Sequence, residues 1–210
     1  MDQAISRQNG RAHVTGLDEP RPVVNLVGER IALGPLSREL LPTYRRWLND
    51  FSLLALLDRR FRPLTADWIE TWFARHDRGD PSSMVFTIWE RGSWLPIGNA
   101  ALQDLDLRNR SAELGLFIGE PGHRRQGYGT EATRLVLDFG FNVLGLRSIM
   151  LRVFEYNLAA RRCYEKAGFR EFGRRAQSQF MDGRFWDVIY MECLSGSRVD
   201  TLVDTQWPTG

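Results

Sequence analysis

Apolar residues recur along this chain with two spacings, which together predict seven strands and four helices. Alternating or short continuous apolar runs are typical of strands, whereas apolar residues three and four positions apart are typical of amphipathic helices. The strand pattern covers residues 29–36, 83–90, 95–107, 112–118, 147–154, 169–180 and 184–193. The helix pattern covers residues 37–49, a segment that begins after Thr65, and residues 130–144 and 157–167. This order of elements predicts an α/β (α+β) fold, in which helices cover the faces of a mixed sheet.

Turn and capping residues mark where these elements begin and end. Ser37, Thr65 and Asn157 each precede a helical pattern, and we expect each of them to cap a helix. Gly168 follows the last helix, where a residue with positive φ commonly ends the helix. The Asp-Gly pair at residues 182–183 predicts a tight turn between the last two strands, which therefore form a hairpin.

The patterned region forms one predicted domain, residues 26–194. Residues 1–25 are polar and contain several glycines and prolines, so we expect a flexible arm there. Residues 195–210 have a similar composition and are expected to form a loose tail. A chain of 210 residues without an internal repeat or a central linker fits one domain with tails.

Composition narrows the classes of function. The net charge is +2, so the charge balance indicates no nucleic-acid partner. No apolar run reaches the roughly 18 residues that a membrane span needs, and residues 1–14 lack the apolar core of a signal peptide. Cys163 and Cys193 are far apart and lack histidines in a ligand pattern, so we expect both to be reduced and buried, with no metal. These features predict a soluble cytoplasmic protein without a membrane partner.

A glycine-rich loop follows the fourth predicted strand and opens the third predicted helix. Its residues are Arg124, Arg125, Gln126, Gly127, Tyr128, Gly129 and Thr130. The two glycines keep side chains away from the main-chain amides, and the positive end of the helix dipole lies beside them. This arrangement predicts an anion site, most simply for a pyrophosphate. Because the loop is neither a Walker loop nor the dinucleotide-binding fingerprint, the alternative is a turn with two flexible glycines and two solvated arginines.

Two motifs, one on either side of a predicted strand, resemble those of the GNAT superfamily of N-acetyltransferases. The acetyl-CoA motif Arg/Gln-x-x-Gly-x-Gly/Ala matches residues 124–129. A second motif, Asn-x-x-Ala-x-x-x-Tyr-x-x-x-Gly-Phe, matches Asn157, Ala160, Tyr164, Gly168 and Phe169. The resemblance covers about residues 26–194 and is strongest to the branch of ribosomal-protein N-acetyltransferases and bacterial spermidine acetyltransferases. It implies a GNAT fold, with a mixed sheet of about seven strands, about four helices, and a splay between the fourth and fifth strands.

The resemblance also implies where acetyl-CoA, the expected cosubstrate, would bind. The pantetheine arm would join an open strand edge as an added strand, and the pyrophosphate would rest on the glycine-rich loop. The implied contacts are the main chain of Phe117, Ile118 and Gly119, the amides of residues 125–130, the charged side chains of Arg124 and Arg125, and Asn157 with Ala160 of the second motif. Asn157 would reach the pantetheine amides, and its alternative role is that of a plain helix cap.

The implied reaction is attack of a neutral amine on a thioester, after which the leaving thiolate takes a proton. Tyr164 aligns with the general acid of the family, since a phenol is neutral at pH 7 and can donate a proton. Its alternative role is that of a core aromatic. The general base stays open among Glu113, His123, Glu155 and a chain of water molecules. For Glu113, the role of a surface carboxylate paired with Arg110 is as plausible as that of a general base.

The acceptor amine is the least specified part of the prediction. In the family, the segment that here comprises residues 49–64 covers the acceptor, and its apolar run at residues 51–57 fits no element clearly. A protein N-terminus, a polyamine and another small amine all stay open. A polyamine would need a cluster of carboxylates, for which Asp104, Asp106 and Glu113 are candidates. A homodimer also stays open, and the alternative function is that of a non-catalytic CoA-binding sensor.

Overall fold

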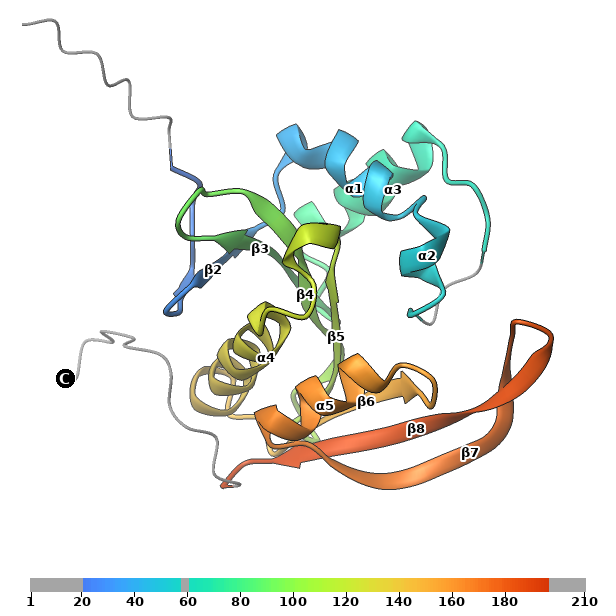
Figure 1. Cartoon of the computed structure of the whole chain (residues 1–210). Helices are drawn as coiled ribbons and strands as arrows, with labels where there is room; N and C mark the ends of the chain where they lie inside the picture. The colour runs from blue at the N-terminus through green and yellow to red at the C-terminus, as the bar shows by residue number, and fades with distance from the viewer. Residues whose placement is uncertain (1–20, 58–60, 197–210) are drawn as a thin grey trace, which may run out of the picture.

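The computed structural model describes residues 21–57 and 61–196, which form one eight-stranded sheet with helices on both faces (Figure 1). The strands are β1 (Leu26–Val27), β2 (Ile31–Pro35), β3 (Met84–Glu90), β4 (Pro96–Asp106), β5 (Ser111–Ile118), β6 (Ser148–Phe154), β7 (Arg170–Met181) and β8 (Arg184–Leu194). The predicted mixed sheet is confirmed, because β2 to β8 are the seven expected strands and the eighth is the two-residue β1. The predicted arm and tail lie mostly outside the described residues.

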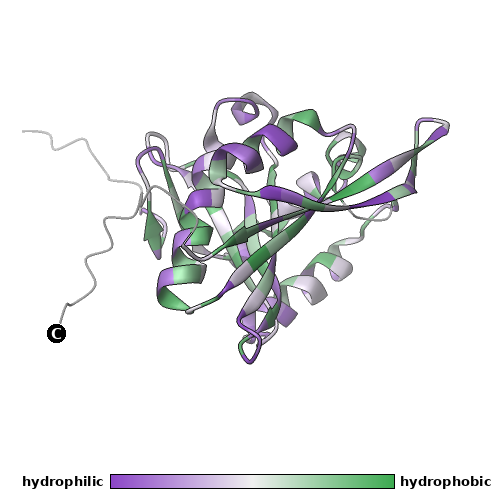
Figure 2. Ribbon diagram, turned by 90° about the horizontal axis from the view of Figure 1, so that it is seen from below, coloured by the Kyte–Doolittle hydropathy of each residue, from purple (hydrophilic) through white to green (hydrophobic). Residues whose placement is uncertain are grey.

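The sheet has the order β1-β2-β3-β4-β5-β6-β8-β7 and contains a single parallel pair. All neighbouring strands run antiparallel except β5 and β6. A parallel pair needs a crossover connection, and the helix α4 supplies it here. The last two strands form the predicted hairpin, with Asp182 and Gly183 at positive φ in the turn. This β7–β8 ribbon projects from the body of the molecule and carries both hydrophilic and hydrophobic residues (Figure 2).

Five α-helices occur in the described part of the chain, four of them at predicted positions. They are α1 (Leu41–Trp47), α2 (Phe51–Leu54), α3 (Ala66–Asp77), α4 (Tyr128–Asp138) and α5 (Leu158–Ala167), accompanied by the short segments η1 (Arg38–Leu40), η2 (Pro121–His123) and η3 (Phe139–Val143). The additional helix is α2, which occupies the apolar run that fitted no element. The predicted helix 130–144 begins earlier than expected and widens at its end into the π-type turn η3.

Local capping predictions are largely confirmed. The Thr65 hydroxyl accepts a hydrogen bond from the amide of Trp68 at 3.2 Å, and Gly168 ends α5 with φ +106°. The cap predicted for Ser37 is wrong, because the chain enters the 3₁₀ segment η1 and the Ser37 side chain makes no capping bond. Its main-chain amide donates instead to the Tyr44 hydroxyl at 3.2 Å, so a tertiary contact replaces the local one.

The helices pack on the two faces of the sheet as two layers (Figure 1). Along β5, Ala112 and Leu114 belong to the main core with α4 and α5, since successive side chains of a strand point to opposite faces. Phe117 packs on the other face, against a second cluster from α1, α2 and α3. The buried members of that cluster are Tyr44, Trp47, Leu48, Leu53, Ile69 and Phe73.

Helix α1 is fixed to the end of β5 by close contacts around Trp47. The Trp47 indole lies directly over Gly119, where an added Cβ would come within 2.4 Å of the ring. Its Nε1 donates to Glu120 at 2.9 Å, and its ring meets that of Phe117 edge-on with centroids 6.0 Å apart. Glu120 also pairs with Arg46, and hydrogen bonding to this arginine lowers the pKa of the carboxyl. The end of β5 is therefore held in place immediately before the glycine-rich loop.

We expect Gly119→Ala to destabilise the fold, because the new methyl group would collide with the Trp47 ring. Overpacking of this kind costs about 1–3 kcal/mol in the free energy of unfolding. Urea titration followed by circular dichroism measures it. Gly122→Ala is the matched control, since nothing lies within 4 Å of the added Cβ there. Equal unfolding midpoints for the two variants would contradict the close packing of α1 on β5.

Candidate active site

The parallel pair β5–β6 separates partway along its length. The strands pair only between residues 111–113 and 148–150, although β5 continues to residue 118 and β6 to residue 154. β4 and β8 occupy the outer edges of the two strands, so the unpaired stretches face each other. This confirms the predicted splay. We call the unpaired region, residues 114–118 and 151–154, the gap; its main-chain groups can receive an extended chain as an added strand.

Hydrogen bonds at the end of β5 show which main-chain groups face the gap. The Gly119 amide donates to the carbonyl of Ile97 at 2.8 Å, and the Phe117 carbonyl also lies against β4. Since the direction alternates along a strand, Ile118 and Leu116 turn their main-chain groups toward the gap. Of the three predicted contacts, only Ile118 therefore offers its amide to a cofactor. The sequence analysis did not single out Leu116, because its orientation depends on the register with β4.

The glycine-rich loop turns directly into α4. Gly127 is the N-cap of this helix and has φ +91°, a conformation that residues with a side chain rarely adopt. The helix begins at Tyr128, two residues before the predicted start at Thr130. The amides of its first turn have no carbonyl partner within the helix, and the helix dipole adds positive potential there. The loop thus presents the main-chain donors expected of an anion site.

Arg124 turns inward and clamps the end of β5. Its Nε donates to the carbonyl of Ile118 and its Nη2 to that of Gly119, each at 3.0 Å. Nη2 also lies 3.4 Å from Asp50 Oδ2 at the start of α2. Hydrogen bonds from Ser52, followed by the contact with Arg124, keep the pKa of Asp50 below its usual value. Arg124 is therefore not a solvated arginine, because its guanidinium joins the loop, β5 and α2.

Arg30, at the start of β2, holds the loop through its main chain. Its Nη1 donates to the carbonyl of Gln126 at 2.8 Å, and its guanidinium carbon lies 4.2 Å from the ring centroid of Tyr128. In the first turn of α4, Glu131 accepts a hydrogen bond from the Arg30 amide at 2.8 Å. Sequence reasoning missed Arg30, because no local pattern links it to a loop so distant in the chain.

Cys163 joins the start of α4 to α5. Its sulfur accepts a hydrogen bond from the Thr130 hydroxyl at 3.4 Å, and an added Cβ at Gly129 would lie 3.4 Å from the same sulfur. Burial raises the pKa of the Cys163 thiol. Cys163 and Cys193 are both free thiols, as predicted, although Cys163 is only partly buried. The start of α4 and the middle of α5 therefore meet at ordinary contact distance around this sulfur.

Helix α5 carries the residues of the second motif. Asn157 caps it by accepting from the Ala160 amide at 3.2 Å, while its Nδ2 lies 3.4 Å from the carbonyl of Leu56. Tyr164, two turns later, is 6% exposed and packs edge-on against Phe169. Burial raises its pKa, so the phenol stays protonated at neutral pH. No described residue hydrogen-bonds to this hydroxyl, which leaves it available to a ligand.

A family comparison agrees with this geometry. Residues 30–170 match the family model described as the acetyltransferase (GNAT) domain. The match spans more than half of the chain and includes both sides of the gap, the glycine-rich loop and α5. The chain belongs to the GNAT acetyltransferase family.

Relatives of this GNAT protein include enzymes named for different acceptors. The chain is 26% identical to mouse alpha/beta-tubulin-N-acetyltransferase 9, over 70% of this chain and 64% of that protein. It is 35% identical to the spermidine N(1)-acetyltransferase of Vibrio cholerae, over 47% of this chain and 56% of that protein. These matches span less than two thirds of either relative. The crystal structure of Vibrio cholerae spermidine N-acetyltransferase in complex with CoA and spermine has a TM-score of 0.74 and 26% identity, over 80% of this chain and 97% of that one.

Two candidate bases of this GNAT domain are paired with arginines, and the third, His123, has a ring contact and a buried Nδ1 without a hydrogen-bond partner among the described residues. Glu113 pairs with Arg152 of β6 at 2.9 Å, rather than with Arg110. Glu155 pairs with Arg174 at 3.2 Å. The ring of His123 packs against that of Tyr128, with centroids 5.6 Å apart. The structure therefore singles out no dedicated base, which is compatible with proton removal through water.

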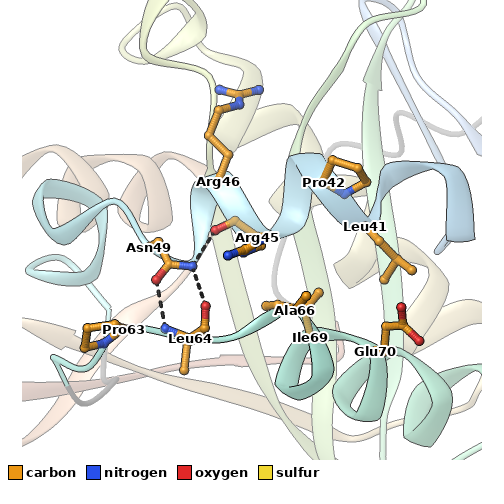
Figure 3. Close-up of a pocket in the computed structure, with 10 residues that line it drawn as sticks. All are labelled: Leu41, Pro42, Arg45, Arg46, Asn49, Pro63, Leu64, Ala66, Ile69 and Glu70. Carbon is orange, nitrogen blue, oxygen red and sulfur yellow. Dashed lines mark hydrogen bonds between the residues drawn. The ribbon is translucent and has the colours of Figure 1, made fainter.

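A hollow of about 620 Å³ lies between α1 and α3, apart from the residues of the gap (Figure 3). Its lining residues are Leu41, Pro42, Arg45, Arg46, Asn49, Pro63, Leu64, Ala66, Ile69 and Glu70. Across its floor, Asn49 Oδ1 accepts from the Leu64 amide at 2.8 Å, and Asn49 Nδ2 donates to the Leu64 carbonyl at 3.2 Å. These two bonds join the two ends of the segment between α1 and α3.

Within residues 21–57 and 61–196, no helix is long and apolar enough to cross a bilayer. The same residues hold no group of three or more His, Cys, Asp or Glu side chains that could bind a metal ion.

We expect Gly127→Ala to weaken coenzyme A binding about tenfold, since a side chain at φ +91° costs roughly 1–3 kcal/mol or turns the loop amides away. Gly122→Ala, before the loop, is the matched variant, because nothing lies within 4 Å of the added Cβ there. It should bind within about twofold of the wild type. Titration calorimetry with coenzyme A measures both. Equal losses for the two variants would argue against the loop as the anion site.

Proposed function

We propose that this protein is an acetyl-CoA-dependent N-acetyltransferase that transfers the acetyl group directly to a primary amine. The observation that carries the proposal is the gap between β5 and β6, which opens beside the glycine-rich loop at the start of α4. Membership of the GNAT family and the similarity to a CoA-bound acetyltransferase support it.

The proposed cofactor position follows from the donors on the two sides of the gap. The pantetheine arm lies along β5 and bonds to the main chain of Leu116 and Ile118. The pyrophosphate rests on the amides of residues 125–130, where the helix dipole adds to their potential. Asn157 keeps its capping bond through Oδ1, and its Nδ2 can turn from Leu56 to a pantetheine carbonyl.

The proposed reaction needs no covalent enzyme intermediate. The amine nitrogen attacks the acetyl carbon, the carbon–sulfur bond breaks, and the thiolate of coenzyme A leaves. Tyr164 donates a proton to this sulfur, while the nitrogen loses one to water or to a nearby base, so the protons balance. The amide of Ile118 faces the gap and can polarise the acetyl carbonyl. A neutral phenol at this position holds its proton until negative charge develops on the sulfur.

We expect Tyr164→Phe to lower kcat about a hundredfold, because general acids typically contribute this much or more. Coenzyme A affinity should stay within about twofold, since the ring and its packing remain. Steady-state kinetics with acetyl-CoA and calorimetry with coenzyme A separate the two quantities. Tyr190→Phe, which removes a hydroxyl on β8, is the control. Unchanged turnover in Tyr164→Phe would remove this residue from the acid role.

The alternative is a CoA-binding sensor without catalysis. Such a protein would bind coenzyme A but would release no free thiol from acetyl-CoA with any amine. The Tyr164 hydroxyl favours the enzyme, because it has no hydrogen-bond partner among the described residues and can donate to the sulfur of coenzyme A.

We further propose that the acceptor carries one amine rather than several. Among the described residues, five carboxylates lie near the gap at the ends of β5 and β6, at α2 and on β8, and they share four arginines. The pairs are Glu113–Arg152, Glu120–Arg46, Glu155–Arg174, Asp187–Arg174 and Asp50–Arg124. A polyamine with three or four positive charges would gain little from surroundings so nearly neutral. A protein N-terminus or another single amine needs no such negative cluster.

The other carboxylates suggested for a polyamine lie away from the gap. Asp106 faces Ser111 in the β4–β5 pair, at the end of β5 opposite the gap, and its carboxylate accepts from Asn109. Asp104 belongs to the same end of β4, where the pairing register shifts. Neither residue adds negative charge where the amine would attack.

We expect kcat/KM for an N-terminal peptide amine to exceed that for spermidine by about tenfold or more. Arg174→Gln should raise kcat/KM for spermidine several-fold, because it releases Glu155 and Asp187. Arg75→Gln breaks a distant ion pair with Asp80 and serves as the matched control. A wild-type preference for spermidine would refute the single-amine proposal while leaving acetyl transfer intact.

A further inference from the structure

The chain between α1 and α3 begins with a short segment that contacts both sides of the gap. This segment, residues 50–57, contains α2 and the turn after it, and we call it the strap. The hydrogen bonds between Asn49 and Leu64 hold together the two ends of the chain that connects α1 to α3 (Figure 3). Leu53 and Leu54 are buried, so the strap packs against the body of the molecule.

The first end of the strap is tied to the β5 side of the gap. Asp50 contacts Arg124 at 3.4 Å, and the same guanidinium holds the carbonyls of Ile118 and Gly119. The start of the strap therefore depends on the clamp that fixes the end of β5.

The other end is tied to the β6 side by the two residues that precede α5. The Tyr156 hydroxyl donates to the carbonyl of Ala55 at 2.6 Å, and Asn157 Nδ2 lies 3.4 Å from the carbonyl of Leu56. The Tyr156 ring stacks on Phe154, the last residue of β6, with centroids 5.3 Å apart. The strap consequently crosses from one side of the gap to the other.

The Tyr156 hydroxyl is also in contact with the β7–β8 ribbon. Its ring meets Trp186 of β8 edge-on at 5.2 Å, and the side chain of Gln179 on β7 reaches the hydroxyl. Burial raises the pKa of Tyr156 to about 12, and the contact with Gln179 opposes this shift. The phenol therefore stays a neutral donor throughout the physiological pH range.

We propose that Tyr156 is a positioning residue for the amine acceptor, because its hydroxyl holds the strap across the open end of the gap. The inference rests on the proposed function, since the thioester would lie in this gap. Phe51 and Leu56 of the strap are 47% and 38% exposed, so the strap presents apolar surface beside the opening. These side chains form one wall against which the body of a single-amine acceptor packs.

The strap depends on such tethers because a helix of one turn is not stable alone. Removing the phenol oxygen leaves the Ala55 carbonyl without its donor, while the ring contacts of Tyr156 persist. The strap then samples positions away from the gap, and acceptor binding weakens. Acetyl-CoA binding is unaffected, because the glycine-rich loop keeps its own contacts with Arg30 and Arg124.

The test is Tyr156→Phe in the full chain, with Tyr190→Phe as the matched control. We expect KM for a peptide amine to rise about five- to tenfold, because the hydrogen bond from Tyr156 to the strap is lost. kcat and the Kd of coenzyme A should stay within about twofold. Hydrogen exchange provides a readout without turnover: the amides of Leu56 and Leu57, which donate to Leu53 and Leu54, should exchange faster in the variant.

An unchanged KM for the acceptor in Tyr156→Phe would overturn the inference, even if the strap amides exchanged faster. A fall in kcat at constant KM would also overturn it, since that pattern belongs to a group acting in the transition state. These results leave the proposed function standing. Failure of the wild type to acetylate any amine would instead overturn the proposed function, and exchange of the strap amides would still report the tether.

Discussion

The missing hydrogen bonds between β5 and β6 are the constraint on which the rest of the site depends. A parallel pair that continued to residues 118 and 154 would leave no strand edge for an extended ligand. Because the strands pair only through their first three residues, their ends diverge, yet each keeps its other neighbour in the sheet. The ends of β5 and β6 therefore lack hydrogen bonds to each other but remain fixed by β4 and β8 on their outer edges.

The cost of this opening is limited by contacts that hold its two sides in place. Arg124 satisfies the Ile118 carbonyl, which would otherwise face the gap without a partner. On the opposite side, Tyr156 and Asn157 hold the segment that follows α1. The glycine-rich loop, the strap and the strand ends thus share a few polar side chains, so a change in one of these parts also alters the contacts of the others.

Local signals in the sequence predicted most of the fold, and tertiary contacts account for what they missed. The cap at Thr65 and the turn after residue 181 depend on neighbouring residues, and both occur as expected. Ser37 carries the same capping signal, but its side chain makes no capping bond and its amide donates to the Tyr44 hydroxyl. The partner of Glu113 is Arg152 rather than Arg110, because the pairing of β5 with β6 brings Arg152 close although it is distant in the sequence. The orientation of Leu116 and the contacts of Tyr156 depend on strand register and packing, which no single-sequence pattern contains.

The strand order at the C-terminal edge has a consequence for biosynthesis. β8 lies between β6 and β7, so the last strand of the domain to be synthesised must insert beside a strand made well before it. Ile189 and Met191, both buried in the main core, arrive with it. On the ribosome, the outer edge of β6 therefore stays exposed until β8 has emerged, and the domain can complete its folding only after that point.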